Sequence, residues 1–79
     1  MLKACVIGMG NIGNIHARVY NEYDKVQLAG VCDIIPERAE RAGKKFGVPF
    51  YIDAEEMLKE IKPDICSVTT GGFEYSSDH

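Results

Sequence analysis

Three glycines near the start of the chain have the spacing needed to hold a phosphate-bearing ligand. Gly8, Gly10 and Gly13 form the pattern G-x-G-x-x-G. Gly8 suits a tight turn, Gly10 leaves room for a pyrophosphate, and Gly13 lets the following helix pack closely on the preceding strand. The N–H groups of Asn11 and Ile12 would then face the phosphates at the positive end of the helix dipole.

A carboxylate, Asp33, ends the next apolar segment about 20 residues later, where it can accept hydrogen bonds from the adenosine ribose hydroxyls. Taken alone, the glycines could simply form a tight turn, and Asp33 could be a solvated residue at the end of a strand. The dinucleotide fingerprint requires both features together. The combination favours NAD, because a 2′-phosphate would meet the negative carboxylate and Ile34 supplies no cation. Arg38 could still reach the adenine side, so NADP is the less favoured alternative.

Strands and helices are expected to alternate around these residues. Short apolar segments predict strands over 3–8, 26–33, 48–51 and 64–69, whereas helices are predicted over 11–23 and 36–46 and from 53 until Pro63. Strands that are apolar on both faces indicate a sheet covered on both sides. The sequence therefore predicts an α/β fold, a Rossmann-type doubly wound parallel sheet of strand order 3-2-1-4, truncated after strand 4.

The first helix has a periodic apolar stripe that predicts its inner face and leaves Asn14 more outward. The stripe consists of Ile12, Ile15, Val19, Tyr20 and Tyr23. His16, on the same helix, is interpreted as a packing residue rather than a catalyst.

The three cysteines lie far apart in apolar segments, with no CxxC spacing, and are expected to be small buried hydrophobic residues: Cys5, Cys32 and Cys66. His79 has no partner at ligand spacing, so no metal site is predicted. No pair of nucleophile and base can be identified, and no catalytic residue is assigned. The P-loop pattern is absent, so the sequence gives no support for ATP or GTP hydrolysis.

Composition narrows the class of protein further. The 79 residues are 46% hydrophobic and 27% charged, which is typical of a globular chain of at most one domain. A formal net charge of −3 without a basic stripe argues against nucleic acid as a partner. No apolar run is long enough for a membrane span and no signal peptide is evident, so no membrane partner and a cytoplasmic location are expected.

The wider pattern resembles the glucose-fructose oxidoreductase / inositol dehydrogenase / MocA (Gfo/Idh/MocA) family over nearly the whole chain. The resemblance rests on the glycines followed by His16 and Ala17, on D-x-x-P-E-R-A-E from Asp33 to Glu40, on Gly47-Val48-Pro49 and on Pro63-Asp64-Ile65. It implies that residues 1–79 are the N-terminal part of an NAD(P)-binding Rossmann domain. The remainder of that domain and a C-terminal substrate domain would be absent from this chain.

The resemblance also implies an activity, which is hydride transfer between NAD and a hydroxyl carbon of a sugar, cyclitol or related polyol. The catalytic residues would lie beyond residue 79, the 79 residues alone would be inactive, and the second domain would support a homo-oligomer. By family position, Thr69, Thr70 and Gly71 would contact the cofactor. The family commonly has T-P-N after its fourth strand, and Thr69-Thr70-Gly71-Gly72 departs from that pattern.

Two other functions share parts of the pattern. A nucleotide-sensing regulatory Rossmann module carries the same glycines and acidic residue, and fold alone does not separate it from an enzyme. A methyltransferase that uses S-adenosylmethionine usually has G-x-G-x-G, which Ile12 breaks. His16-Ala17 and the phrase from Pro36 to Glu40 favour the oxidoreductase.

Overall fold

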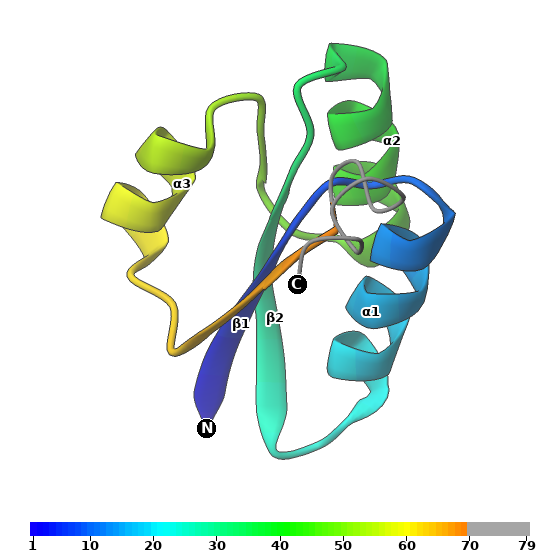
Figure 1. Cartoon of the computed structure of the whole chain (residues 1–79). Helices are drawn as coiled ribbons and strands as arrows, with labels where there is room; N and C mark the ends of the chain where they lie inside the picture. Colours follow the sequence, from blue (N-terminus) through cyan, green and yellow to red (C-terminus); the bar gives the residue numbers. More distant parts are fainter. Residues whose placement is uncertain (70–79) are drawn as a thin grey trace, which may run out of the picture.

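A four-stranded parallel sheet separates helices that lie on its two faces (Figure 1). The computed structural model describes residues 1–69. Its elements are β1 (Leu2–Ile7), α1 (Asn11–Glu22), β2 (Val26–Cys32), α2 (Pro36–Phe46), β3 (Phe50–Tyr51), α3 (Ala54–Ile61) and β4 (Ile65–Val68). The strand order is β3-β2-β1-β4, as predicted. Figure 1 shows α1 and α2 on one face and α3 on the other, because the direction of crossover reverses after β3.

The register of the sheet brings the predicted site residues to one edge. In β1, Ile7 is in register with the last residues of both β2 and β4. The carboxyl ends of parallel strands meet on the same side of a sheet. Gly8, Asp33 and Thr69, which follow these three strands, are therefore neighbours in space although they are distant in sequence.

Alternate residues of the strands supply two separate cores. The core beneath α1 and α2 contains Val6, Met9, Ala17, Leu28, Val31 and Ala42. The core beneath α3 contains Cys5, Cys32 and Met57. Neighbouring residues such as Cys5 and Val6 point to opposite faces, as the two-residue period of a strand requires. The expectation of a sheet covered on both faces is confirmed over β1 and β2.

The helix ends follow from local sequence. Pro36 occupies the first turn of α2, and Gly47 ends that helix in the left-handed region with φ of 69°. At the start of α3, the Asp53 side chain accepts a hydrogen bond of 3.0 Å from the backbone N–H of Glu55. None of the helices within residues 1–69 is long and apolar enough to cross a membrane.

The prediction for the inner face of α1 is right for Tyr20, which packs against the core beneath the helix, and wrong for the other four residues of the stripe. Ile12, Ile15, Val19 and Tyr23 are all half or more exposed, and the buried residues of the helix are Gly13 and Ala17. The reason is the closeness of α1 to β1: a Cβ added to Gly13 would overlap the carbonyl oxygen of Gly8. Only small residues fit at such a contact, so size rather than hydrophobicity determines which side of α1 faces the sheet.

The prediction for the cysteines is right for two of the three residues. Cys5 and Cys32 are buried, whereas Cys66 is exposed. Cys66 lies beside Cys5 in the register of β4 with β1, but α3 packs mainly against β2 and β3. Among residues 1–69, no group of His, Cys, Asp and Glu side chains could hold a metal ion.

Candidate functional site: a dinucleotide turn

The turn between β1 and α1 begins with a glycine in a conformation that other residues rarely adopt. Gly8 has φ of 96°, and its backbone N–H donates a hydrogen bond of 2.7 Å to the carbonyl oxygen of Cys32. A side chain at this φ would be strained. Gly8 therefore lets the chain leave β1 and turn at once into the helix, as predicted for the first glycine of the pattern.

The second glycine lies at the start of α1 and leaves open space in front of the helix. Gly10 is the N-cap residue, and no side chain caps the helix. Within the part of the chain that the structure describes, a Cβ added to Gly10 would have only one neighbour within 4 Å, the Nη1 atom of Arg38 at 3.9 Å. Asn11 and Ile12 follow in the first turn and are exposed. This space and the free N–H groups of the first turn suit an anionic group such as a pyrophosphate.

Asp33 is fixed against the glycine turn by both of its carboxylate oxygens. Oδ2 accepts a hydrogen bond of 2.8 Å from the backbone N–H of Met9, and Oδ1 accepts one of 2.9 Å from the N–H of Ile35. The residue is only 5% exposed. Each oxygen can accept a further bond, so this geometry leaves acceptor capacity for ribose hydroxyls while it orients the carboxylate. The ribose contact itself stays a prediction.

Thr69 connects the end of β4 to the same turn. Its hydroxyl donates to the carbonyl oxygen of Gly8 at 2.6 Å and also lies 3.2 Å from that of Ile7. The backbone N–H of Thr69 donates to Ile7 as well, at 2.8 Å. Thr69 thus supports the glycine turn from the other side of β1. The predicted cofactor contacts of Thr70 and Gly71 lie outside the described residues.

Asn14 has a part in this turn that the sequence analysis missed. Its side-chain Nδ2 donates to the carbonyl oxygens of Met9 and Gly10, at 3.0 and 2.9 Å. The residue is half-buried rather than outward. The sequence feature that could have predicted this role is the position of Asn14 one turn after Gly10. From there a short amide side chain can reach back to the start of the helix.

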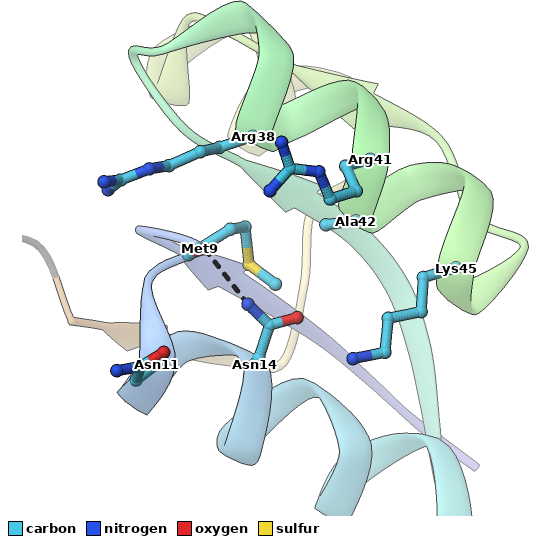
Figure 2. A pocket seen from close by; sticks show the side chains of 7 residues that line it. All are labelled: Met9, Asn11, Asn14, Arg38, Arg41, Ala42 and Lys45. Atoms are coloured by element: carbon cyan, nitrogen blue, oxygen red, sulfur yellow. Dashed lines mark hydrogen bonds between the residues drawn. The ribbon is translucent and has the colours of Figure 1, made fainter.

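A pocket of about 310 Å³ lies beside the turn, between α1 and α2 (Figure 2). Its lining consists of Met9, Asn11, Asn14, Arg38, Arg41, Ala42 and Lys45. Arg38, predicted as a cofactor contact, is therefore brought next to Gly10 and Asn11. Arg41 and Lys45 were not predicted, although three cations spaced three and four residues apart indicate one face of a helix.

Two thiols of the sheet, those of Cys5 and Cys32, are buried. Burial raises the pKa of Cys5 to about 11 and that of Cys32 to about 11. Both groups are neutral thiols at pH 7, whereas the thiolate is the reactive form. Within residues 1–69 the arrangement can orient and bind a ligand with phosphate groups, and the groups described above do not form a nucleophile with its base.

Known proteins with similar sequences include dehydrogenases of a glucoside and of inositol. D-glucoside 3-dehydrogenase of Escherichia coli is 32% identical over 69 residues, covering 85% of this chain and 20% of that protein. Inositol 2-dehydrogenase of Salmonella paratyphi B is 31% identical over 71 residues, covering 86% of this chain and 21% of that protein. The chain spans about a fifth of the length of these relatives.

A solved structure of an oxidoreductase is also similar to this chain. An oxidoreductase from Agrobacterium radiobacter in complex with NAD⁺, L-tartaric acid and magnesium matches with a TM-score of 0.78 at 26% identity, over 87% of this chain and 20% of that one. The family model described as "Oxidoreductase family, NAD-binding Rossmann fold" matches residues 2–79. Together with the glycine turn and the strand order, this match shows that the chain belongs to the Gfo/Idh/MocA family of oxidoreductases.

Proposed function

We propose that this chain is the NAD-binding portion of a dehydrogenase that oxidises a hydroxyl carbon of a sugar, cyclitol or related polyol. The observation that carries the proposal is the meeting of the open glycine turn with Asp33 at one edge of the sheet. The family match and the dehydrogenase relatives support the same reaction class.

Different residues of the turn would bind different parts of the dinucleotide. The free N–H groups at Asn11 and Ile12 would bind the pyrophosphate, and the absent side chain at Gly10 would let it approach. Asp33, already oriented by Met9 and Ile35, would accept hydrogen bonds from the ribose hydroxyls. When bound, the nicotinamide supplies the hydride acceptor that no side chain can provide.

NAD is the preferred cofactor in this proposal. A buried carboxylate fixed at the ribose end disfavours a phosphate in direct contact with it, because two negative groups would be close in a site of low dielectric. Ile34, which follows Asp33, is 80% exposed and carries no charge. The Agrobacterium radiobacter relative was solved with NAD⁺, which supports the same choice.

Substrate binding and proton transfer are assigned to a second domain outside these 79 residues. The chain spans about a fifth of the length of the relatives it matches. We propose that the full-length protein contains the remainder of the Rossmann domain and a substrate domain, and that it is a homo-oligomer.

The test is a dehydrogenase assay on the full-length protein with NAD and a panel of aldoses, inositols and simple polyols. The near-ultraviolet absorbance of reduced nicotinamide reports hydride transfer. Turnover with at least one polyol, faster with NAD than with NADP, is the expected result. Tight NAD binding without turnover on any member of the panel would contradict the dehydrogenase proposal and favour a nucleotide-sensing module.

A further inference from the structure

Asn14 holds two carbonyl groups of the glycine turn with one side chain. Its Nδ2 atom donates hydrogen bonds of 3.0 Å to the carbonyl oxygen of Met9 and of 2.9 Å to that of Gly10, and Figure 2 shows the bond to Met9. The backbone N–H of Asn14 also donates to the carbonyl oxygen of Gly10, at 3.0 Å. This one residue of α1 is therefore bonded three times to the segment that precedes the helix.

The segment that Asn14 holds has unusual backbone freedom. Met9 lies between Gly8 and Gly10, and glycine loses more conformational freedom than any other residue when its backbone is fixed. Gly10 is also the N-cap residue of α1, and no side chain caps the start of the helix. The backbone between β1 and α1 must therefore be held by side chains from other positions.

Side chains from three parts of the fold hold this segment, and each binds a different backbone group. Asp33, after β2, accepts a hydrogen bond from the N–H of Met9, and Thr69, after β4, donates one to the carbonyl oxygen of Gly8. Asn14 binds the two carbonyl groups that come next along the chain. Of the three side chains, Asn14 therefore holds the part of the turn closest to the start of α1, in front of which the pyrophosphate would bind.

Peptide geometry converts these bonds into the orientation of two N–H groups. The C=O and N–H of a trans peptide unit lie in one plane and point in opposite directions. The carbonyl group of Met9 shares its unit with the N–H of Gly10, and the carbonyl group of Gly10 shares its unit with the N–H of Asn11. Because Asn14 draws both carbonyl groups toward the body of α1, both N–H groups point toward the open space before the helix. The carbonyl oxygens, which would repel a phosphate, are turned away from that space.

We propose that Asn14 is a positioning residue for the dinucleotide, which fixes the glycine turn in the conformation that binds the pyrophosphate. The inference rests on the proposed function, because it concerns the same site. A turn that is ordered before the ligand arrives loses less conformational entropy on binding, so it binds the ligand more tightly. Asn14 should therefore strengthen the binding of ligands that carry a pyrophosphate and should not affect ligands that reach only Asp33.

The test compares two ligands on the full-length protein by isothermal titration calorimetry. NAD contains the pyrophosphate, whereas adenosine does not and is measured by its displacement of NAD. Asn14→Ala removes the Nδ2 donor. Asn14→Ser keeps a donor that can reach the carbonyl group four residues back, that of Gly10, but not the carbonyl group of Met9. Asn21→Ala is the matched control, because Asn21 is an exposed residue farther along the same helix.

Asn14→Ala is expected to weaken NAD binding by about fivefold to tenfold and to change the affinity for adenosine by less than about twofold. Asn14→Ser should lose less NAD affinity than Asn14→Ala, because one of the two side-chain bonds remains. Asn21→Ala should change either affinity by less than about twofold. A side chain that only stabilised the fold would not separate the two ligands, because the folded protein would bind both as before.

A second measurement does not depend on NAD. Hydrogen–deuterium exchange, read by mass spectrometry on peptides that cover residues 8–14, reports how well the turn is ordered. In the ligand-free full-length protein, Asn14→Ala is expected to speed exchange in these peptides by about fivefold or more. Asn21→Ala should leave exchange in the same peptides unchanged.

The proposal is overturned if Asn14→Ala weakens NAD binding no more than Asn21→Ala does, if NAD and adenosine lose affinity by the same factor, or if exchange in the turn is unchanged. Should Asn14→Ala fail to fold by circular dichroism, Asn14→Ser decides by the same criteria. Failure of the proposed function looks different: the parent protein would bind neither NAD nor adenosine, whereas Asn14→Ala would still speed exchange in the turn.

Discussion

Met9 and Asp33 are 24 residues apart, and the backbone N–H of Met9 donates a hydrogen bond of 2.8 Å to Oδ2 of Asp33. This bond connects the middle of the glycine turn to the end of β2. A residue expected only to contact the ribose therefore also holds the turn that would bind the phosphates. We therefore expect stability and cofactor binding to be coupled at this carboxylate.

Replacing Asp33 by Asn is expected to lower the free energy of unfolding by about 1–3 kcal/mol. The amide has one oxygen, so whichever way it is turned, either Met9 or Ile35 loses the acceptor of its N–H. Denaturant unfolding followed by circular dichroism measures the loss. Asp53→Asn is the matched control, because Asn caps a helix as well as Asp, and it should stay within about 0.5 kcal/mol of the parent. Equal losses of unfolding free energy in the two variants would show that the hydrogen bonds to Asp33 contribute no more to stability than those at an ordinary helix cap.

Gly13→Ala is expected to destabilise the fold by about 3 kcal/mol or more. The added methyl group would overlap the backbone carbonyl of Gly8 and lie 2.9 Å from Oγ1 of Thr69, so α1 would have to move away from β1. Thermal unfolding gives the comparison with Gly10→Ala, which adds the same methyl group into open space. A Gly13→Ala variant as stable as Gly10→Ala would mean that α1 packs less closely than described.

Thr69→Val is expected to cost about 1 kcal/mol of stability. Valine has the same shape but removes the hydroxyl that donates to the carbonyl oxygen of Gly8 at 2.6 Å. Thr69→Ser keeps the hydroxyl and should recover most of the loss. Urea midpoints of the three proteins decide the matter, and an equal loss for valine and serine would assign the effect to packing rather than to the hydrogen bond.

Stability is expected to fall as the pH rises from about 9 to about 11. Burial raises the pKa of both Cys5 and Cys32 from 9.0 to about 11. The folded state therefore holds these protons more tightly than the unfolded state. The contribution is complete below pH 9 and is lost as the pH rises toward the folded pKa.

The readout is the slope of unfolding free energy against pH in the parent and in Cys5→Ala/Cys32→Ala. Other groups also titrate in this range, so the contribution of the two thiols is measured by the difference in slope between the parent and the double variant. The double variant is less stable overall because it leaves cavities, but its slope should be shallower. Parallel slopes would show that the two thiols do not contribute.

Much of the fold could be predicted from short-range signals. Pro36 and Gly47 mark the ends of α2, and alternating strands and helices give the order β3-β2-β1-β4. Such signals depend on backbone preferences and on hydrophobic periodicity, both of which are set by residues close together in the sequence. The glycine turn and the end of β2 were located for the same reason.

The inner face of α1 could not be predicted because it depends on distance to another element. Hydrophobic spacing favoured Ile12 and Ile15, but the sheet lies so close that Gly13 and Ala17 face it. The hydrogen bonds of Asn14 and Thr69 to the turn were missed for a related reason, and the cofactor contact of Thr69 stays a prediction. Both hydrogen-bond to carbonyl groups of the turn, and such partners become visible only when the elements are placed in space.

The most direct test of the central claim is titration of the full-length protein with NAD, in the parent and in Gly10→Val, by isothermal titration calorimetry. Among residues 1–69, a Cβ added at Gly10 meets no atom closer than Nη1 of Arg38 at 3.9 Å, so the fold is expected to persist. The valine side chain would fill the space through which the pyrophosphate approaches the backbone. The dinucleotide turn predicts saturable NAD binding to the parent and its loss in the variant, with the far-ultraviolet circular dichroism unchanged. NAD binding of equal affinity in the two proteins, or no binding to the folded parent, would contradict it.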